Sequence, residues 1–173
     1  MIRRAIRFLI REWKIRRDPI AYTRSIGVQV GENCRLIGVD AGTFSSEPYL
    51  IRLGNRVTIT AGVRFITHDD GVWLFLDEFP DLDIIAPIRV GNNVYIGINA
   101  IIMPGVTIGD NCIIGAGSIV TRDIPSGSVA VGSPARVIKT VDQYKEKALK
   151  DALRIRTLTP TKKREALIKK FIE

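Results

Sequence analysis

The sequence predicts a mainly β protein, in which short strands coil around a narrow interior, with a helical appendage at each end. Two observations carry this prediction. Aliphatic side chains recur every six residues from residue 90 to residue 120, and a glycine usually follows each of them. Segments rich in basic residues, with a helical pattern, flank this region on both sides. The 173 residues suit one compact domain with terminal additions.

Residues 1–22 are expected to form a basic amphipathic helix. Apolar side chains at helical spacing alternate here with basic ones, and residues 1–18 hold seven Lys or Arg against Glu12 and Asp18. Such a helix can rest on an anionic membrane surface or on phosphates, or it can pack on protein with its charged face in solvent. We favour packing, and keep residues 1–18 as a candidate for peripheral membrane contact.

An unbroken six-residue repeat starts at residue 90. Its aliphatic positions are Val90, Ile96, Ile102, Ile108, Ile114 and Val120. Four residues after each of these stands a mostly small side chain. Steps of six scatter around a helix of about 3.6 residues per turn, so the pattern is not helical. It favours short strands joined by tight corners, with each aliphatic side chain pointing into the interior.

Earlier hexads run in other phases, at Val30, Leu36, Leu53, Ile59 and Phe65. The phase changes require non-repeat segments within about 39–51 and about 67–88. The second segment lacks glycine corners and mixes aromatic with acidic residues, which predicts a loop extruded from the coil. We therefore expect a coil domain over 23–140 and a helical C-terminal extension over 141–173.

The composition restricts the cellular compartment and the classes of partner that we expect for this protein. The formal net charge is +8, but residues 19–140 carry nine basic against eleven acidic side chains, so no nucleic-acid-binding face is expected on the body. No apolar run approaches the roughly 18 residues of a membrane span, and the charged N-terminus is unlike a secretory signal. Cys34 and Cys112 both stand at the position of the six-residue repeat that usually holds a small side chain, so we interpret them as fillers of the interior. We expect a cytoplasmic protein with no metal site.

The run VGNNVYIGINAIIMPGVTIGDNCIIGAGSIVTRDIPSGSVAVGSPARVIK strongly resembles the hexapeptide-repeat acyltransferases. The segment SSEPYLIRLGNRVTITAGVRFITHDDG is most similar to the sugar and polysaccharide O-acetyltransferases, near maltose and galactoside acetyltransferases. The resemblance covers about residues 26–140. It implies a left-handed parallel β-helix with three strands per coil, a homotrimer with active sites between neighbouring coils, and acetyl-coenzyme A as acyl donor.

His68 is the only histidine in the chain and lies three residues beyond the hexad position of Phe65. Acetyl transfer from a thioester to a sugar hydroxyl needs a base near neutral pH, and the ordinary pKa of histidine, about 6.5, suits that task. In the resembled family, a histidine at this position deprotonates the acceptor, which attacks the thioester directly. The resemblance therefore implies that His68 is the catalytic base.

Four residues of the two non-repeat segments are candidates for the acceptor site. The acids Glu47, Asp69 and Asp70 are candidates to orient the imidazole or to accept hydrogen bonds from sugar hydroxyls. Trp73 is a candidate to stack on a sugar face or to pack against the base of the loop.

The resemblance also implies a donor site on the later coils. Tyr95 stands where the family often has tryptophan, and the small residues Gly97 and Ala116 would let the pantetheine arm approach the backbone. Small residues are also what tight corners require. The positions that match the phosphate and adenine end of the donor are Thr121, Arg122, Arg136 and Lys139. Cations suit such a multiply anionic ligand.

Together these features predict an O-acetyltransferase that uses acetyl-CoA and a small-molecule or glycan acceptor, a sugar or polysaccharide precursor. Two alternatives remain open at this point. An N-acetyltransferase acting on an amino-sugar nucleotide would have the same coil, because an amine acceptor also needs a base. A non-catalytic hexapeptide-repeat scaffold would not need His68 beside an acidic loop.

Overall fold

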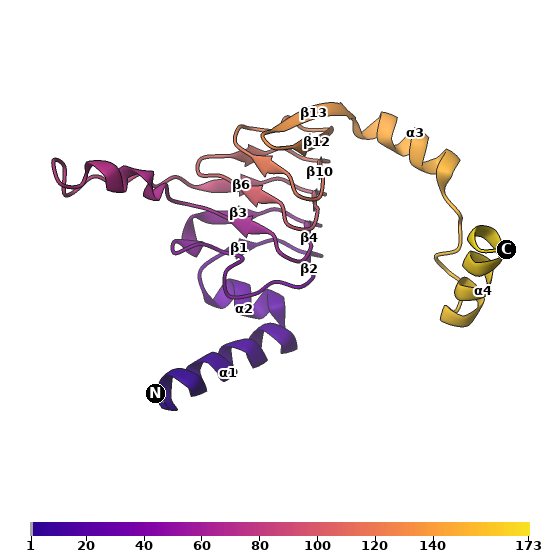
Figure 1. Cartoon of the computed structure of the whole chain (residues 1–173), viewed down its shortest axis with the longest axis horizontal. Coiled ribbons are helices and arrows are strands. Elements are labelled where there is room, and N and C mark those ends of the chain that lie inside the picture. Colours follow the sequence, from indigo (N-terminus) through magenta and orange to yellow (C-terminus); the bar gives the residue numbers. More distant parts are fainter. Residues whose placement is uncertain (1) are drawn as a thin grey trace. The chain divides into compact units, whose positions relative to one another are not determined.

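The computed structural model describes residues 2–173 and divides into two compact units, Met1–Asp142 and Gln143–Glu173. The first unit holds two helices and all of the strands (Figure 1). The second holds most of one helix and the whole of another. Each unit is described by itself below.

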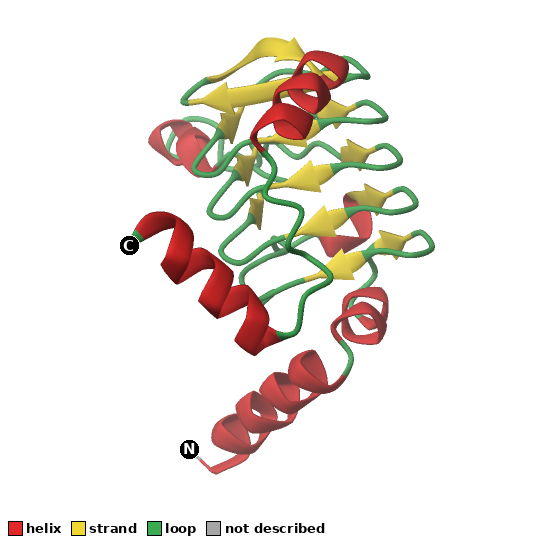
Figure 2. Cartoon of the chain, turned by 90° about the vertical axis from the view of Figure 1, so that its right-hand side faces the viewer, coloured by secondary structure: helices red, strands yellow, loops and turns green. Residues whose placement is uncertain are grey.

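The body of the first unit is a parallel β-helix, in which short strands stack into three sheets (Figures 1 and 2). The first sheet contains β1 (Gln29–Val30), β3 (Ile51–Leu53), β6 (Ile88–Val90) and β9 (Thr107–Ile108). The second contains β2 (Arg35–Leu36), β4 (Thr58–Ile59), β7 (Tyr95–Ile96), β10 (Ile113–Ile114), β12 (Ser128–Gly132) and β13 (Ala135–Thr140). The third contains β5 (Arg64–Phe65), β8 (Ile101–Ile102) and β11 (Ile119–Val120). The predicted coil of short strands is confirmed.

The hexad side chains form the core. In the run from residue 90, each aliphatic hexad side chain is at most 4% exposed. The strand register places equivalent positions of successive turns side by side, as in the pairing of Ile59 with Ile96 and of Ile96 with Ile114. Cys34 and Cys112 are also buried, and burial raises the pKa of the Cys112 thiol. Their predicted role as interior fillers is confirmed by this burial.

The two non-repeat segments enter the fold differently. In the first, Phe44 bridges to Phe65 and stacks on its ring, with centroids 5.4 Å apart, so this segment still contributes a side chain to the core. In the second, the chain leaves the coil after Thr67 and returns at β6, and Figure 1 shows the loop extending away from the sheets. A short helical stretch, η2 (Asp70–Phe75), lies within this loop.

The repeat ends in a hairpin that spacing alone did not predict. β12 pairs in parallel with β10 and then turns back, so that β13 pairs antiparallel with β12. β13 therefore covers the edge of β12 that a further turn of the coil would otherwise occupy.

The N-terminal segment forms two helices where the sequence predicted one over 1–22. α1 (Ile2–Arg17) ends before Asp18, and α2 (Pro19–Ser25) begins after it. The break has a local cause: the carboxylate of Asp18 accepts a hydrogen bond from the backbone N–H of Ala21 at 2.9 Å, and proline suits the first position of a new helix.

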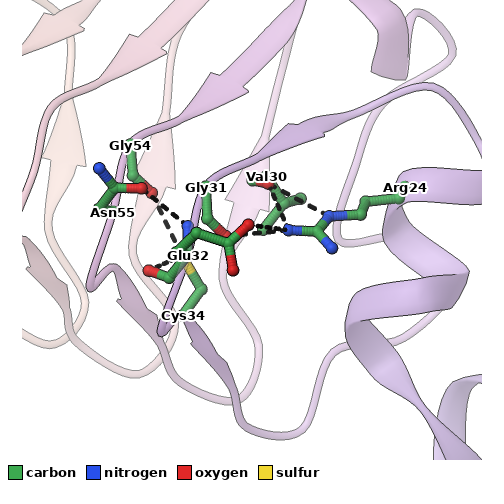
Figure 3. A network of polar contacts seen from close by, with 7 residues as sticks. All are labelled: Arg24, Val30, Gly31, Glu32, Cys34, Gly54 and Asn55. Carbon is green, nitrogen blue, oxygen red and sulfur yellow. Dashed lines mark hydrogen bonds and ion pairs between the residues drawn. The ribbon is translucent and has the colours of Figure 1, made fainter.

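α2 is fastened to the first turn of the coil by Arg24 (Figure 3). Its guanidinium donates to the backbone carbonyl oxygens of Val30, at 2.8 Å, and Gly31, at 3.2 Å. It also lies 3.3 Å from a carboxylate oxygen of Glu32, whose backbone N–H donates to the side chain of Asn55 on the next turn. α2 therefore caps the first turn of the β-helix through specific polar contacts.

The C-terminal extension also forms two helices, α3 (Val141–Asp151) and α4 (Pro160–Phe171). Thr159 caps α4 by accepting a hydrogen bond from the backbone N–H of Lys162. Over residues 2–173, the structure contains no helix whose length and apolar content would let it cross a bilayer.

Candidate active site

His68 lies at the base of the extruded loop, on backbone that is held on both sides. The residue pairs with Ile85 in an antiparallel bridge. The N–H of Ala86 donates to the carbonyl oxygen of Thr67, and the N–H of Asp69 donates to that of Ile84, each at 2.9 Å. The two ends of the loop thus form a short ladder, which fixes the position of the imidazole.

Glu47 lies against the imidazole. Its Oε2 is 3.0 Å from His68 Nδ1 and accepts a hydrogen bond from the hydroxyl of Thr67 at 2.6 Å. The Oγ of Ser45 is 3.2 Å from the same ring nitrogen. The side chains of His68 and Glu47 are 23% and 17% exposed, so the pair is sheltered yet open to a ligand.

This cluster forms because the first non-repeat segment runs beside the end of β5. The N–H of Phe65 donates to the carbonyl oxygen of Thr43, and the N–H of Ser45 donates to that of Phe65. The pairing brings residues 43–47 alongside residues 65–68. Two segments that each interrupt the repeat therefore meet at His68.

The carboxylate determines the chemistry of the ring. An ionised carboxylate only accepts hydrogen bonds, so Nδ1 carries the proton toward Glu47 and the lone pair of the neutral ring lies on Nε2. The hydrogen bond that His68 donates to the Glu47 carboxylate raises the pKa of His68 above its ordinary value of 6.5. The hydrogen bonds from Thr67 and His68 lower the pKa of Glu47 below 4.5. The imidazole is thereby suited to accept a proton at Nε2.

The other acceptor-site candidates occupy different positions. Asp70 places Oδ2 3.4 Å from His68 Nε2, but its side chain is 92% exposed. Asp69 faces the loop, where its carboxylate accepts a hydrogen bond from the N–H of Gly71 and caps η2. Trp73 lies on η2 and is 73% exposed in the single chain. Glu47 and Asp70 therefore touch the imidazole, whereas Asp69 supports the loop.

The donor-site candidates lie on the later turns of the coil. Tyr95 is on β7, partly exposed, in a surface hollow that it shares with Arg56, Asn93 and Asn111. Thr121 and Arg122 follow β11 and are exposed. Arg136 and Lys139 belong to β13, and the Arg136 guanidinium donates to the carbonyl oxygen of Ala135.

The small residues Gly97 and Ala116 meet each other at a corner. A Cβ added to Gly97 would lie 2.6 Å from the backbone nitrogen of Ala116, on the next turn. Gly97 is buried, while Ala116 is exposed. The close packing of successive corners is therefore sufficient reason for a glycine at position 97.

Sequence reasoning missed two members of the His68 cluster, Ser45 and Thr67. Thr67 is fully buried, and its hydroxyl holds Glu47 against the ring. A signal for Thr67 was present in its position directly before the histidine. No signal pointed to Ser45, because its contact depends on how the first non-repeat segment folds.

Comparisons with known proteins agree with this fold. The family described as bacterial transferase hexapeptide (six repeats) matches residues 87–122, and the hexapeptide repeat of succinyl-transferase matches residues 27–64. A crystal structure of a maltose O-acetyltransferase from Clostridium difficile 630 has 32% sequence identity and a TM-score of 0.50, over 69% of this chain and 73% of that one.

Two curated relatives extend the likeness. Protein CapG of Staphylococcus aureus is 51% identical over 150 residues, which cover 87% of each chain. Galactoside O-acetyltransferase of Escherichia coli (strain K12) is 37% identical over 134 residues, 77% of this chain and 64% of the relative. With these likenesses and its six-residue repeat, the chain belongs to the hexapeptide-repeat acyltransferases, as an acetyltransferase near the maltose and galactoside O-acetyltransferases.

Proposed function

We propose that this acetyltransferase moves an acetyl group from acetyl-CoA to a hydroxyl of a sugar or polysaccharide precursor, with His68 as general base. The observation that carries the proposal is the 3.0 Å contact between His68 Nδ1 and the Glu47 carboxylate. A base held in one tautomer by a carboxylate is the arrangement that activates a weak hydroxyl nucleophile. The names of the galactoside and maltose O-acetyltransferases support a sugar as the acceptor.

The reaction proceeds by direct attack, without an acyl-enzyme. His68 Nε2 takes the proton from the acceptor hydroxyl while the hydroxyl oxygen attacks the thioester carbonyl carbon. The resulting tetrahedral intermediate collapses, the carbon–sulfur bond breaks, and the CoA thiolate takes the proton from the imidazolium. Glu47 stabilises the imidazolium between these two transfers, and general base catalysis of this kind contributes about 10²- to 10⁴-fold in rate.

The donor is proposed to lie along the later turns. Thr121, Arg122, Arg136 and Lys139 would hold the phosphate and adenine end, since cations suit a ligand with several phosphates. Arg122 and Arg136 are exposed, and Lys139 is half-buried. Tyr95 would contact the donor from β7. Gly97 and Ala116 would line the path of the pantetheine arm.

The working unit is proposed to be a homotrimer of left-handed coils, with each site between two protomers. The hollow around Tyr95 is lined by no residue of the His68 cluster, which favours a site assembled from two chains. The loop also supports assembly, because Trp73, Leu74 and Phe75 are each more than half exposed in the single chain. Apolar side chains gathered in this way mark an interaction surface.

The proposed compartment is the cytoplasm, where reduced cysteines and acetyl-CoA coexist. Cys34 and Cys112 are unpaired and buried, which agrees with a reducing environment.

The experiment that tests the function is thiol release from acetyl-CoA across a panel of sugars, with wild type, His68→Ala and His68→Gln. We expect wild-type turnover with a sugar hydroxyl and a loss of about 100-fold or more in both variants. Ser46→Ala, at an exposed neighbour of the cluster, serves as the matched control and should retain activity. Light scattering and circular dichroism should show all four proteins folded and equally assembled.

Each alternative outcome rejects a stated part of the proposal. Near-normal turnover in a folded His68→Ala protein would remove His68 as the base. Transfer only to amino sugars would make the enzyme an N-acetyltransferase. No turnover by wild type with any acceptor, even though the protein is folded, would favour a scaffold.

A further inference from the structure

The outer face of α1 is apolar and has no partner in the described structure. At about 100° per residue, Ile6, Leu9, Ile10 and Trp13 fall within roughly 100° of one another around the helix. Their side chains are between 49% and 64% exposed. A continuous apolar stripe of this kind on a helix requires a partner of some sort.

The same stripe points away from the protein body. Ile15 is 5% exposed and belongs to the hydrophobic core of the first unit, so its side of α1 faces the body. By the helical period, Ile15 lies nearly opposite the centre of the apolar stripe. α1 joins α2 at its C-terminal end (Figure 1). Because Ile15 faces the body, the apolar stripe on the opposite side of α1 faces outward.

A basic arc borders the stripe along its length. It is formed by Arg3, Arg4, Arg7, Arg11 and Lys14, which again fall within roughly 100°. The one acid of α1, Glu12, lies outside this arc, near Arg11. Glu12 offsets one of these five charges, so the arc keeps a net positive charge next to an exposed apolar surface.

Basic side chains lie over aromatic rings at two places along α1. The guanidinium of Arg17 lies over the indole ring of Trp13, 4.9 Å from its centroid, and that of Arg11 lies 5.4 Å from the Phe8 ring. Tryptophan and arginine side chains favour the boundary between lipid headgroups and acyl chains, where one end of each is apolar and the other is wet.

We propose that α1 binds the surface of an anionic phospholipid membrane, with Ile6, Leu9, Ile10 and Trp13 inserted among the acyl chains. The charge decides between a lipid surface and a second copy of this helix. Packing the apolar stripes of several α1 helices together would bring their bordering basic arcs close to one another, and like charges repel. Anionic headgroups neutralise the same arcs at about 1 kcal/mol for each basic residue near the surface.

The surface so formed differs from the acetyl-transfer site. None of the stripe residues belongs to the His68 cluster or to the donor candidates on β7, β11 and β13. Membrane binding can therefore be tested independently of the acetyl-transfer reaction. It would hold the enzyme beside acceptors carried on lipids.

The experiment is flotation of the full-length protein with vesicles of phosphatidylcholine alone and of phosphatidylcholine mixed with phosphatidylglycerol. We expect flotation with the anionic vesicles only, and a decrease in bound protein of about tenfold or more for Leu9→Ser/Trp13→Ser. The matched control is Ile37→Ser/Ile98→Ser, which removes two similarly exposed apolar side chains from corners of the coil and should float like wild type. Arg3→Gln/Arg7→Gln should bind less and depend less on salt than wild type, because two of the five cations of the arc are removed.

A second measurement reports on insertion itself. The chain contains two tryptophans, so Trp73→Phe leaves Trp13 as the only one. We expect its fluorescence emission to shift to shorter wavelength when anionic vesicles are added, and to stay unchanged with phosphatidylcholine alone.

Three results would overturn the proposal. The first is equal flotation of wild type and Leu9→Ser/Trp13→Ser, which would assign any binding to another segment. The second is a full-length protein that stays unbound to anionic vesicles. The third is a loss of assembly in light scattering of Leu9→Ser/Trp13→Ser, without vesicle binding by wild type, which would identify a second copy as the partner of the stripe.

Discussion

In the proposed reaction, Glu47 acts through the negative charge that it places beside the imidazole of His68. Its carboxylate holds a proton on His68 Nδ1 and raises the pKa of the imidazole. A higher pKa makes the neutral ring a stronger base, but it also leaves less of that neutral form at low pH. The activity of the enzyme should therefore fall as the pH drops through the raised pKa of His68.

Replacing Glu47 by glutamine should move this limb of the pH profile. The amide keeps the size of the side chain but removes the negative charge, so the pKa of His68 falls and the neutral ring persists at lower pH. We expect the acid limb of kcat/KM to shift to lower pH and the plateau to fall by about tenfold or more, because the tautomer is less firmly held. The measurement is kcat/KM for the acceptor across the pH range.

Asp70→Asn is the control for this shift. Asp70 also contributes to the raised pKa of His68, but its 92% exposed carboxylate is screened by solvent. The acid limb of kcat/KM for Asp70→Asn should therefore stay close to that of wild type. A Glu47→Gln profile that superimposes on wild type would contradict the positioning role of Glu47.

A functional residue could be predicted from the sequence where the chain offers only one residue of the type that the chemistry needs. His68 stood out because it is the only histidine and follows a hexad position, whereas Glu47 was one of three acids with equal standing. The structure separates them: Glu47 touches the ring, and Asp69 caps a helical turn. Spacing carries no such information, since these contacts depend on the folded paths of two non-repeat segments.

At the scale of elements, the six-residue repeat predicted which side chains enter the core, because each strand is short and each corner is tight. The helices were less well predicted. One helix was expected over 1–22, yet Asp18 and Pro19 together are a readable signal for a helix start, and the break lies there. The β12–β13 hairpin was missed because it departs from the repeat on which the prediction rested.

The close packing of successive corners gives Gly97 a structural role, whether or not the acyl donor also binds beside it. Gly97→Ala would bring a Cβ within 3 Å of the backbone of the next turn, and backbone yields less readily than a side chain. We expect a loss of about 1–3 kcal/mol in the free energy of unfolding. Chemical denaturation measures it.

Gly42→Ala provides the comparison. An added Cβ there meets only ordinary contacts, at 3.5 Å or more, and the backbone conformation suits alanine. Its stability should equal that of wild type or exceed it slightly. Equal stability of Gly97→Ala and wild type would show that the corners have more room than the structure indicates.

At the scale of the whole molecule, the proposed donor site depends on charge at the end of the coil. Reversing both charges, in Arg136→Glu/Lys139→Glu, should raise the KM for acetyl-CoA by about tenfold or more and leave the KM for the acceptor unchanged. Lys162→Glu/Lys163→Glu, on α4, changes the net charge equally and should leave both constants unchanged. A parallel rise in both constants for the β13 variant would argue against the donor assignment.

The assembly was beyond prediction from spacing, because a repeat specifies how one chain coils and not which faces meet.

A mixing experiment tests whether each site takes His68 from one protomer and the β13 cations from its neighbour. His68→Ala lacks the base, and Arg136→Glu/Lys139→Glu binds the donor poorly, so each alone should be nearly inactive at low acetyl-CoA. In a trimer that contains both variants, one of the three shared sites combines both intact parts. Co-expression with two affinity tags, followed by purification of the mixed trimers, should therefore restore a substantial part of the wild-type rate. If base and cations came from the same protomer, no mixed trimer would contain an intact site, and the rate would stay at the level of the separate variants.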